Sequence, residues 1–87
     1  MTDFWYYQFE DRLPSVDLHG SESVVEALEQ LERELFLMYQ KKIKTFRVIY
    51  GIGEGKMQKE VLKALTKNPL VLDYRQEPSG GSSIVFI

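Results

Sequence analysis

Hydrophobic residues recur at helical spacing in two segments of this 87-residue chain, and short β-prone segments separate the two. In the first segment the repeating residues are Val24, Leu28, Leu31, Leu35 and Met38. Steps of three and four residues place them on one apolar stripe of a helix that runs to about Gln40. Ser23 followed by Glu26 is a capping-box pattern, which marks the start of this helix. Four glutamates lie off the stripe and are expected to face solvent: Glu22, Glu26, Glu29 and Glu32.

A second helix is expected over residues 56–67, because Asn68-Pro69 stops the pattern there. Its apolar side holds Met57, Val61, Leu62, Ala64 and Leu65. At about 100° per residue, four lysines fall within one narrow arc on nearly the opposite side. They are Lys56, Lys59, Lys63 and Lys67. The second helix is therefore expected to be apolar on one side and basic on the other.

Four β-prone segments flank these helices, at residues 13–18, 44–50, 70–74 and 82–87, with a turn over residues 76–81. Strands that alternate with helices favour parallel pairing through right-handed crossovers, and the short last loop favours an antiparallel hairpin. The predicted fold class is α/β, in the form of an α+β two-layer sandwich. Its order is β-α-β-α-β-β, with a four-stranded mixed sheet and both helices on one face.

The length fits a single domain, and a hydrophobic fraction of 44% argues against a disordered chain. The absence of cysteine excludes disulfides, thiolate catalysis and cysteine-based metal sites, and a single histidine excludes a His-rich metal cage. No apolar run approaches the roughly 20 residues of a membrane span. The N-terminus lacks the basic start of a secretion signal. We therefore expect a cytoplasmic protein with no membrane partner, and Met1 favours a stand-alone one.

Residues 1–12 form an aromatic N-terminal arm before the domain expected at residues 13–87. Five of the six positions from Phe4 to Phe9 are aromatic, with no helical or strand period. One interpretation is an extended arm that covers the open face of the sheet. A platform on which bases stack is the second interpretation, and a docking peptide for a protein partner is the third. The sequence does not distinguish between them.

The net charge of −2 conceals an uneven distribution. Residues 41–67 carry a net charge of +6, and the rest of the chain carries −8. Such an asymmetry points to a polyanionic partner that the overall charge would not suggest.

Two loops are expected to meet at one end of the sheet. Asp17-Leu18-His19-Gly20 ends the first strand, and Tyr50-Gly51-Ile52-Gly53-Glu54-Gly55-Lys56 ends the second. If these strands are neighbours, both loops lie at the carboxyl ends of parallel strands, where open α/β sheets place ligands. Helix N-termini at that edge present free N–H groups to a phosphate, and glycines allow its close approach.

Each of these signals is weak by itself. The three glycines match neither the dinucleotide fingerprint nor the P-loop, and a solvated helix face would show the same lysines. Together they predict contact with a phosphate backbone, because the lysine helix begins at the glycine loop. The predicted nucleic-acid-binding residues are Gly20, Tyr50, Gly51, Gly53, Gly55, Lys56, Lys59 and Lys63.

Asp17 and His19 are the candidate catalytic residues. They are two positions apart on a strand and should share one face. A histidine can transfer a proton to or from a ribose hydroxyl or a leaving oxygen, while Asp17 could orient it or assist an ion. The sequence holds no second histidine and no carboxylate cluster suited to two metals. No metal ligands are assigned, and a role for a divalent cofactor such as Mg²⁺ or Mn²⁺ stays open.

The segment Val16-Asp17-Leu18-His19-Gly20 resembles the Leu-Asp-Leu-His-Gly signature of Smr (small MutS-related) domains. The loop from Tyr50 to Met57 is similar to that family's His-Gly-x-Gly-x-Gly-x-Leu motif, and Gly80-Gly81 before an apolar strand is similar to its ending. The resemblance covers residues 13–87. It implies the fold of the C-terminal domain of bacterial translation initiation factor three, with strand order 1-2-4-3.

The resemblance also implies endonuclease activity, either DNA-nicking or RNA-cleaving, with nucleic acid and the ribosome as partners. Asp17 and His19 would be catalytic, and the glycine loop would grip the backbone. Two positions depart from the family pattern: Tyr50 replaces the usual histidine, and Ile52 stands where relatives often carry a basic residue. Tyrosine can donate a hydrogen bond to phosphate but is a poor base at neutral pH. The alternative is therefore a catalytically weak or inactive module that binds nucleic acid or the ribosome. The sequence does not fix the oligomeric state.

Overall fold

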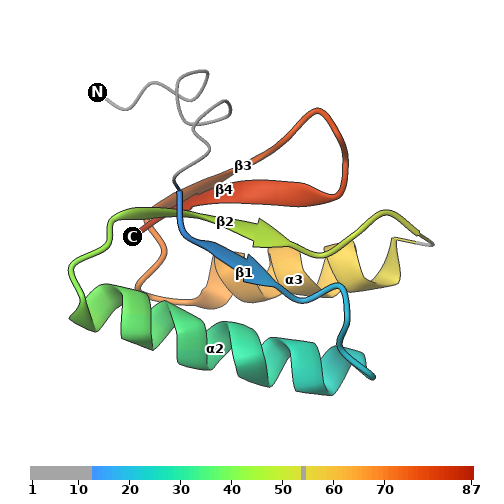
Figure 1. Cartoon of the computed structure of the whole chain (residues 1–87), viewed down its shortest axis with the longest axis horizontal. Helices are drawn as coiled ribbons and strands as arrows, with labels where there is room; N and C mark the ends of the chain where they lie inside the picture. Colours follow the sequence, from blue (N-terminus) through green and yellow to red (C-terminus); the bar gives the residue numbers. More distant parts are fainter. Residues whose placement is uncertain (1–12, 54) are drawn as a thin grey trace.

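The computed structural model describes residues 13–53 and 55–87. The elements are β1 (Ser15–Asp17), α2 (Val24–Gln40), β2 (Thr45–Ile49), α3 (Lys56–Lys67), β3 (Asp73–Gln76) and β4 (Ser82–Phe86). Both helices lie on one face of the sheet, which gives two layers (Figure 1). The predicted fold class is thereby confirmed. The predicted aromatic arm, with its three interpretations, lies outside the described residues.

The sheet has the strand order β1-β2-β4-β3, as expected. β1 pairs parallel with β2, whereas β4 pairs antiparallel with both β2 and β3. In the parallel pair, Asp17 lies opposite Ile49. The two strands therefore end at the same edge of the sheet, which brings the loops that follow them together.

The core lies between the sheet and the helices, and it follows the sequence periods. Alternate residues of β2 and the position after it are buried, at Phe46, Val48 and Tyr50. The helices bury Ala27, Leu31, Leu35 and Met38 from α2, and Val61 and Leu65 from α3. Burial of each large side chain contributes about 1.5–3 kcal/mol. Such packing fixes both helices against the sheet and so fixes the loops at their N-terminal ends.

The helix boundaries match the prediction. Ser23 is the N-cap of α2, and its hydroxyl accepts a hydrogen bond from the Glu26 amide at 3.1 Å. α3 begins after Gly55 and ends before Asn68. Neither helix is long and apolar enough to cross a membrane; this statement applies to the described residues.

The third strand was predicted at residues 70–74 but is found at Asp73–Gln76. The reason is the turn that Asn68 forms after α3. Its side-chain oxygen accepts a hydrogen bond from the Leu70 amide at 2.9 Å, and its carbonyl accepts one from the Val71 amide at 3.1 Å. This turn holds residues 68–71 out of the sheet, and pairing with β4 starts only where the Leu72 amide donates to the Phe86 carbonyl at 2.8 Å.

Candidate nucleic-acid interface

The ends of β1 and β2 lie side by side. The Leu18 amide donates to the Ile49 carbonyl at 2.8 Å, which extends the parallel pairing beyond the last residue of β1. Leu18 is fully buried, whereas Asp17 and His19 are exposed. The alternation predicted for these residues is therefore present, and it directs Asp17 and His19 away from the core.

His19 packs directly against the glycine loop. A Cβ atom placed on Gly51 would lie 2.4 Å from Cδ2 of His19, closer than any side chain tolerates. Gly51 also has φ of +85°, a left-handed conformation that favours glycine. Both observations favour glycine at position 51, because a side chain there would displace the imidazole and strain the backbone. The first loop and the second loop thus meet at the contact between His19 and Gly51.

Gly81, of the Gly80-Gly81 pair before β4, supports the contact between His19 and Gly51. The Gly81 carbonyl accepts hydrogen bonds from the amides of Tyr50 at 3.0 Å and Gly51 at 2.9 Å. A Cβ atom on Gly81 would lie 3.1 Å from Cγ1 of Ile52. Gly81 was not predicted as a site residue, although its place in the Gly-Gly ending was the available signal. It holds Gly51 in place, and Gly51 in turn supports His19.

Asp17 acts on the main chain of its own loop. Its Oδ1 atom accepts a hydrogen bond from the His19 amide at 2.9 Å. This is a local turn of the kind that aspartate forms with the backbone two residues on. The carboxylate therefore orients His19 through the backbone.

Tyr50 differs from the expectation that its hydroxyl could reach a phosphate. Its side chain is only 3% exposed, because it continues the buried alternation of Phe46 and Val48. The hydroxyl donates to the Ser82 carbonyl at 3.1 Å and shares a hydrogen bond with the Ser83 hydroxyl at 2.9 Å. In this structure the hydroxyl joins the end of β2 to the start of β4. The ring of Tyr50 therefore packs in the core beside the site, and its hydroxyl is hydrogen-bonded within the fold.

A pocket of about 260 Å³ lies between His19 and the first turn of α3. Five of its lining residues were predicted to bind nucleic acid: Tyr50, Gly51, Gly53, Gly55 and Lys56. Gly55 is the N-cap of α3, and none of the side chains that the structure describes caps the helix there. The first amide groups of α3 therefore have no side-chain acceptor and can serve an anion. Gly20 is exposed and is not among the residues that line this pocket.

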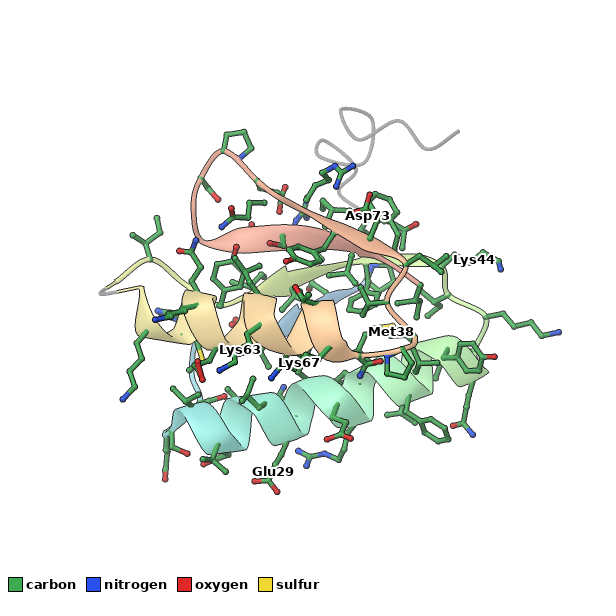
Figure 2. All side chains as sticks on the ribbon, turned by 180° about the vertical axis from the view of Figure 1, so that it is seen from behind. Glu29, Met38, Lys44, Lys63, Lys67 and Asp73 are labelled. Atoms are coloured by element: carbon green, nitrogen blue, oxygen red, sulfur yellow. The ribbon has the colours of Figure 1, made fainter. Side chains whose placement is uncertain are left out.

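The lysine arc is confirmed as a solvent-exposed surface, with Lys56, Lys59, Lys63 and Lys67 all exposed. Within residues 13–53 and 55–87, no acidic partner forms a salt bridge with any of the four. Figure 2 shows Lys63 and Lys67 on α3 and Glu29 on the far side of α2 from them. The four glutamates predicted to face solvent are exposed as well: Glu22, Glu26, Glu29 and Glu32. The net charge of α3 is therefore positive, and the net charge of α2 is negative.

In a comparison with models of known protein families, the model of the Smr domain matches residues 16–87. The chain belongs to the Smr family. One relative is Endonuclease MutS2 of Aquifex aeolicus (strain VF5), which is 32% identical over 79 residues. That match covers 88% of this chain but only 10% of the relative. The present Smr domain therefore spans about a tenth of the length of its curated relative.

The fold of this Smr domain matches a solved structure as well. The crystal structure of the Smr domain of Thermus thermophilus MutS2 superposes with a TM-score of 0.79 at 27% sequence identity. The match covers 85% of this chain and 96% of that one. The family resemblance that the motifs indicated is confirmed by both comparisons.

The described part of the Smr domain has no group of three or more His, Asp or Glu residues that could hold a metal ion. At the site itself, Asp17 already accepts the His19 amide with one oxygen. A magnesium ion in such a place would take most of its ligands from phosphate and water, as this ion commonly does.

Proposed function

We propose that this Smr domain binds the phosphate backbone of a nucleic acid at the start of α3 and cleaves it next to His19. The observation that carries the proposal is the contact between His19 and Gly51. It holds an exposed imidazole at the pocket into which the amides of α3 open. A proton-transfer group and an anion-binding helix end thereby share one pocket.

The phosphate would be held by groups that do not depend on base identity. The N-terminus of α3 supplies backbone N–H groups and the positive end of the helix dipole. Lys56 lines the pocket, and Lys59 and Lys63 continue the positive surface along the helix. At about 1.5 Å per residue, the three lysines cover roughly 10 Å, a length that reaches past one phosphate of an extended strand. Binding is therefore expected to be electrostatic and sensitive to salt.

His19 would serve the cleavage step as a general acid or base. A hydroxyl oxygen attacks the phosphorus atom and forms a new P–O bond, while the bond to the leaving oxygen breaks. The imidazole takes the proton from the attacking hydroxyl or gives one to the leaving oxygen. Asp17 keeps the imidazole in place by holding the His19 amide.

The second candidate function is a module that binds nucleic acid, or a nucleic-acid surface such as that of the ribosome, and does not cut it. The buried Tyr50 favours this alternative. Where the family pattern has a histidine, this chain has a hydroxyl that is engaged with Ser82 and Ser83. His19 would then have to act without a second proton-transfer group from the glycine loop.

The two candidates differ in one assay. The purified protein is incubated with labelled single- and double-stranded RNA and DNA, with and without Mg²⁺ or Mn²⁺. Shortened products in any lane support the endonuclease and identify its substrate. A shift of the labelled strand without shortened products supports the binding module. Absence of both binding and cleavage would contradict both functions.

A further inference from the structure

A second hollow opens on the other side of His19, and the proposed function does not use it. Its volume is about 550 Å³, which is within the range of pockets for small molecules. It shares His19, Gly51 and Ile52 with the pocket at α3. These three residues therefore form a wall with one hollow on each side.

The second hollow lies on the sheet face that points away from the helices. Ile49 and Ser82 line it, and they are partners in the pairing of β2 with β4. Ile49 alternates with the buried residues Val48 and Tyr50, so it faces the opposite side of the sheet. The two hollows are thus reached from different faces of the molecule, with His19 between them.

The chemistry of the second hollow does not suit a phosphate. Beneath it, Arg47 forms a bidentate salt bridge with Glu77, with Nε to Oε1 at 2.7 Å and Nη2 to Oε2 at 3.2 Å. The Ser82 hydroxyl donates to the same Oε1 at 2.6 Å. Arg47 lines the hollow, but its positive charge is already paired with the Glu77 carboxylate, which is only 9% exposed.

Two isoleucines give the second hollow an apolar surface. Ile52 is 77% exposed at the tip of the glycine loop, and Ile49 is half-buried next to the hollow. Their branched side chains offer a surface for a flat, uncharged group. The α3 side of the wall offers amides and a lysine. One side of His19 thus suits a phosphate and the other side suits an apolar ring.

We propose that the second hollow receives an unpaired nucleobase next to the phosphate held at α3. This inference rests on the proposed function, and it assigns the substrate class as single-stranded nucleic acid or an unpaired stretch. A phosphate and a base on opposite sides of one wall can belong to neighbouring nucleotides only if the base leaves its stack. In a duplex the base is paired and stacked, and its extrusion costs a few kcal/mol. Recognition of a base in this position is typical of proteins that bind unpaired strands.

The test compares Ile52→Ala with Leu72→Ala as a matched control. Leu72 is 79% exposed and lies at the opposite end of β4, where its amide donates to Phe86. The probes are fluorescent single-stranded DNA and RNA oligonucleotides and blunt duplexes of the same sequences, titrated at one low salt concentration. Ile52→Ala is expected to weaken single-strand binding by about fivefold or more, and to weaken duplex binding much less, because Ile52 borders the pocket at α3 but offers no group to a phosphate. Leu72→Ala should match the parent with every probe, and the DNA and RNA arms identify the preferred sugar.

A second measurement uses single strands with one abasic site moved along the sequence. The parent should lose affinity at a position next to the bound phosphate, and Ile52→Ala should not respond to that abasic site. If the parent binds in a salt-sensitive manner but Ile52→Ala equals it with all probes, the base site is wrong and the phosphate site stands. If the parent binds none of the probes, both the base site and the proposed function are overturned.

Discussion

A Cβ atom on Gly51 would lie 2.4 Å from Cδ2 of His19, so the imidazole occupies the space that any other residue at position 51 would need. The two residues come from loops that follow different strands, and the parallel pairing of β1 with β2 brings those loops together. The position of the candidate proton-transfer group therefore depends on the absence of a side chain 32 residues away.

Gly51→Ala is expected to displace His19 and to strain the backbone at a φ of +85°. Strain of this kind costs about 1–3 kcal/mol of unfolding free energy. Gly53→Ala is the matched control, since nothing lies within 4 Å of a Cβ atom at that position. Urea denaturation followed by circular dichroism measures the loss of stability, and oligonucleotide anisotropy measures binding. Equal losses of unfolding free energy for the two substitutions would contradict the role given to the contact between Gly51 and His19.

Tyr50→Phe is expected to lower the unfolding free energy by about 1 kcal/mol, because it leaves the buried Ser83 hydroxyl without its partner. Binding of nucleic acid should not change at temperatures where the variant is folded. Tyr74→Phe removes a hydroxyl that bonds Thr66 at an exposed position, and it should cost less. A Tyr50→Phe protein that is as stable as the parent but binds more weakly would show that the hydroxyl reaches the ligand after all.

Two substitutions of Asp17 distinguish its structural role in the turn from the effect of its negative charge. Asp17→Asn keeps an oxygen that can accept the His19 amide, whereas Asp17→Ala removes it. We expect the asparagine variant to keep the stability of the parent and the alanine variant to lose about 1 kcal/mol. Cleavage rates for both variants then show what the turn contributes. If asparagine slows cleavage as much as alanine does, the negative charge of Asp17 matters beyond the turn.

Charge reversal on α3 tests the phosphate surface. Lys59→Glu and Lys63→Glu should each weaken binding and reduce the slope of log K against log salt by roughly 0.7–0.9 per lost phosphate contact. Lys44→Glu is the control, because Lys44 lies at the other end of β2, just before the strand (Figure 2). Each substitution alters the net charge equally. A loss of affinity that is the same for all three variants would indicate a general charge effect and would exclude α3 as the contact surface.

The sequence predicted both helices because their apolar residues recur at a clear helical period. It also predicted that Asp17 and His19 would share one face of the strand, and the structure places both on the exposed side, with Leu18 in the core. The start of β3 could not be predicted, because a single side-chain hydrogen bond from Asn68 decides where the chain leaves its turn. The burial of Tyr50 could have been predicted, since it continues the alternation of Phe46 and Val48.

The site was predicted less completely than the fold. Strand order depended on the resemblance to Smr domains, and only that order placed the two loops side by side. The support that Gly81 gives to Gly51 joins residues 30 positions apart, and no local pattern reports such a contact. The same holds for the second hollow, which draws its lining from β2, the glycine loop and the turn before β4.

The most direct test of the account is the cleavage rate of His19→Ala on whichever nucleic acid the parent cuts, measured beside its folding and binding. Because the imidazole is exposed, its removal should leave the unfolding free energy close to that of the parent, and it should change the binding constant far less than the cleavage rate. Cleavage should fall by about 10²–10⁴-fold, as expected for loss of a general acid or base. A variant that is folded, binds normally and cuts as fast as the parent would contradict it.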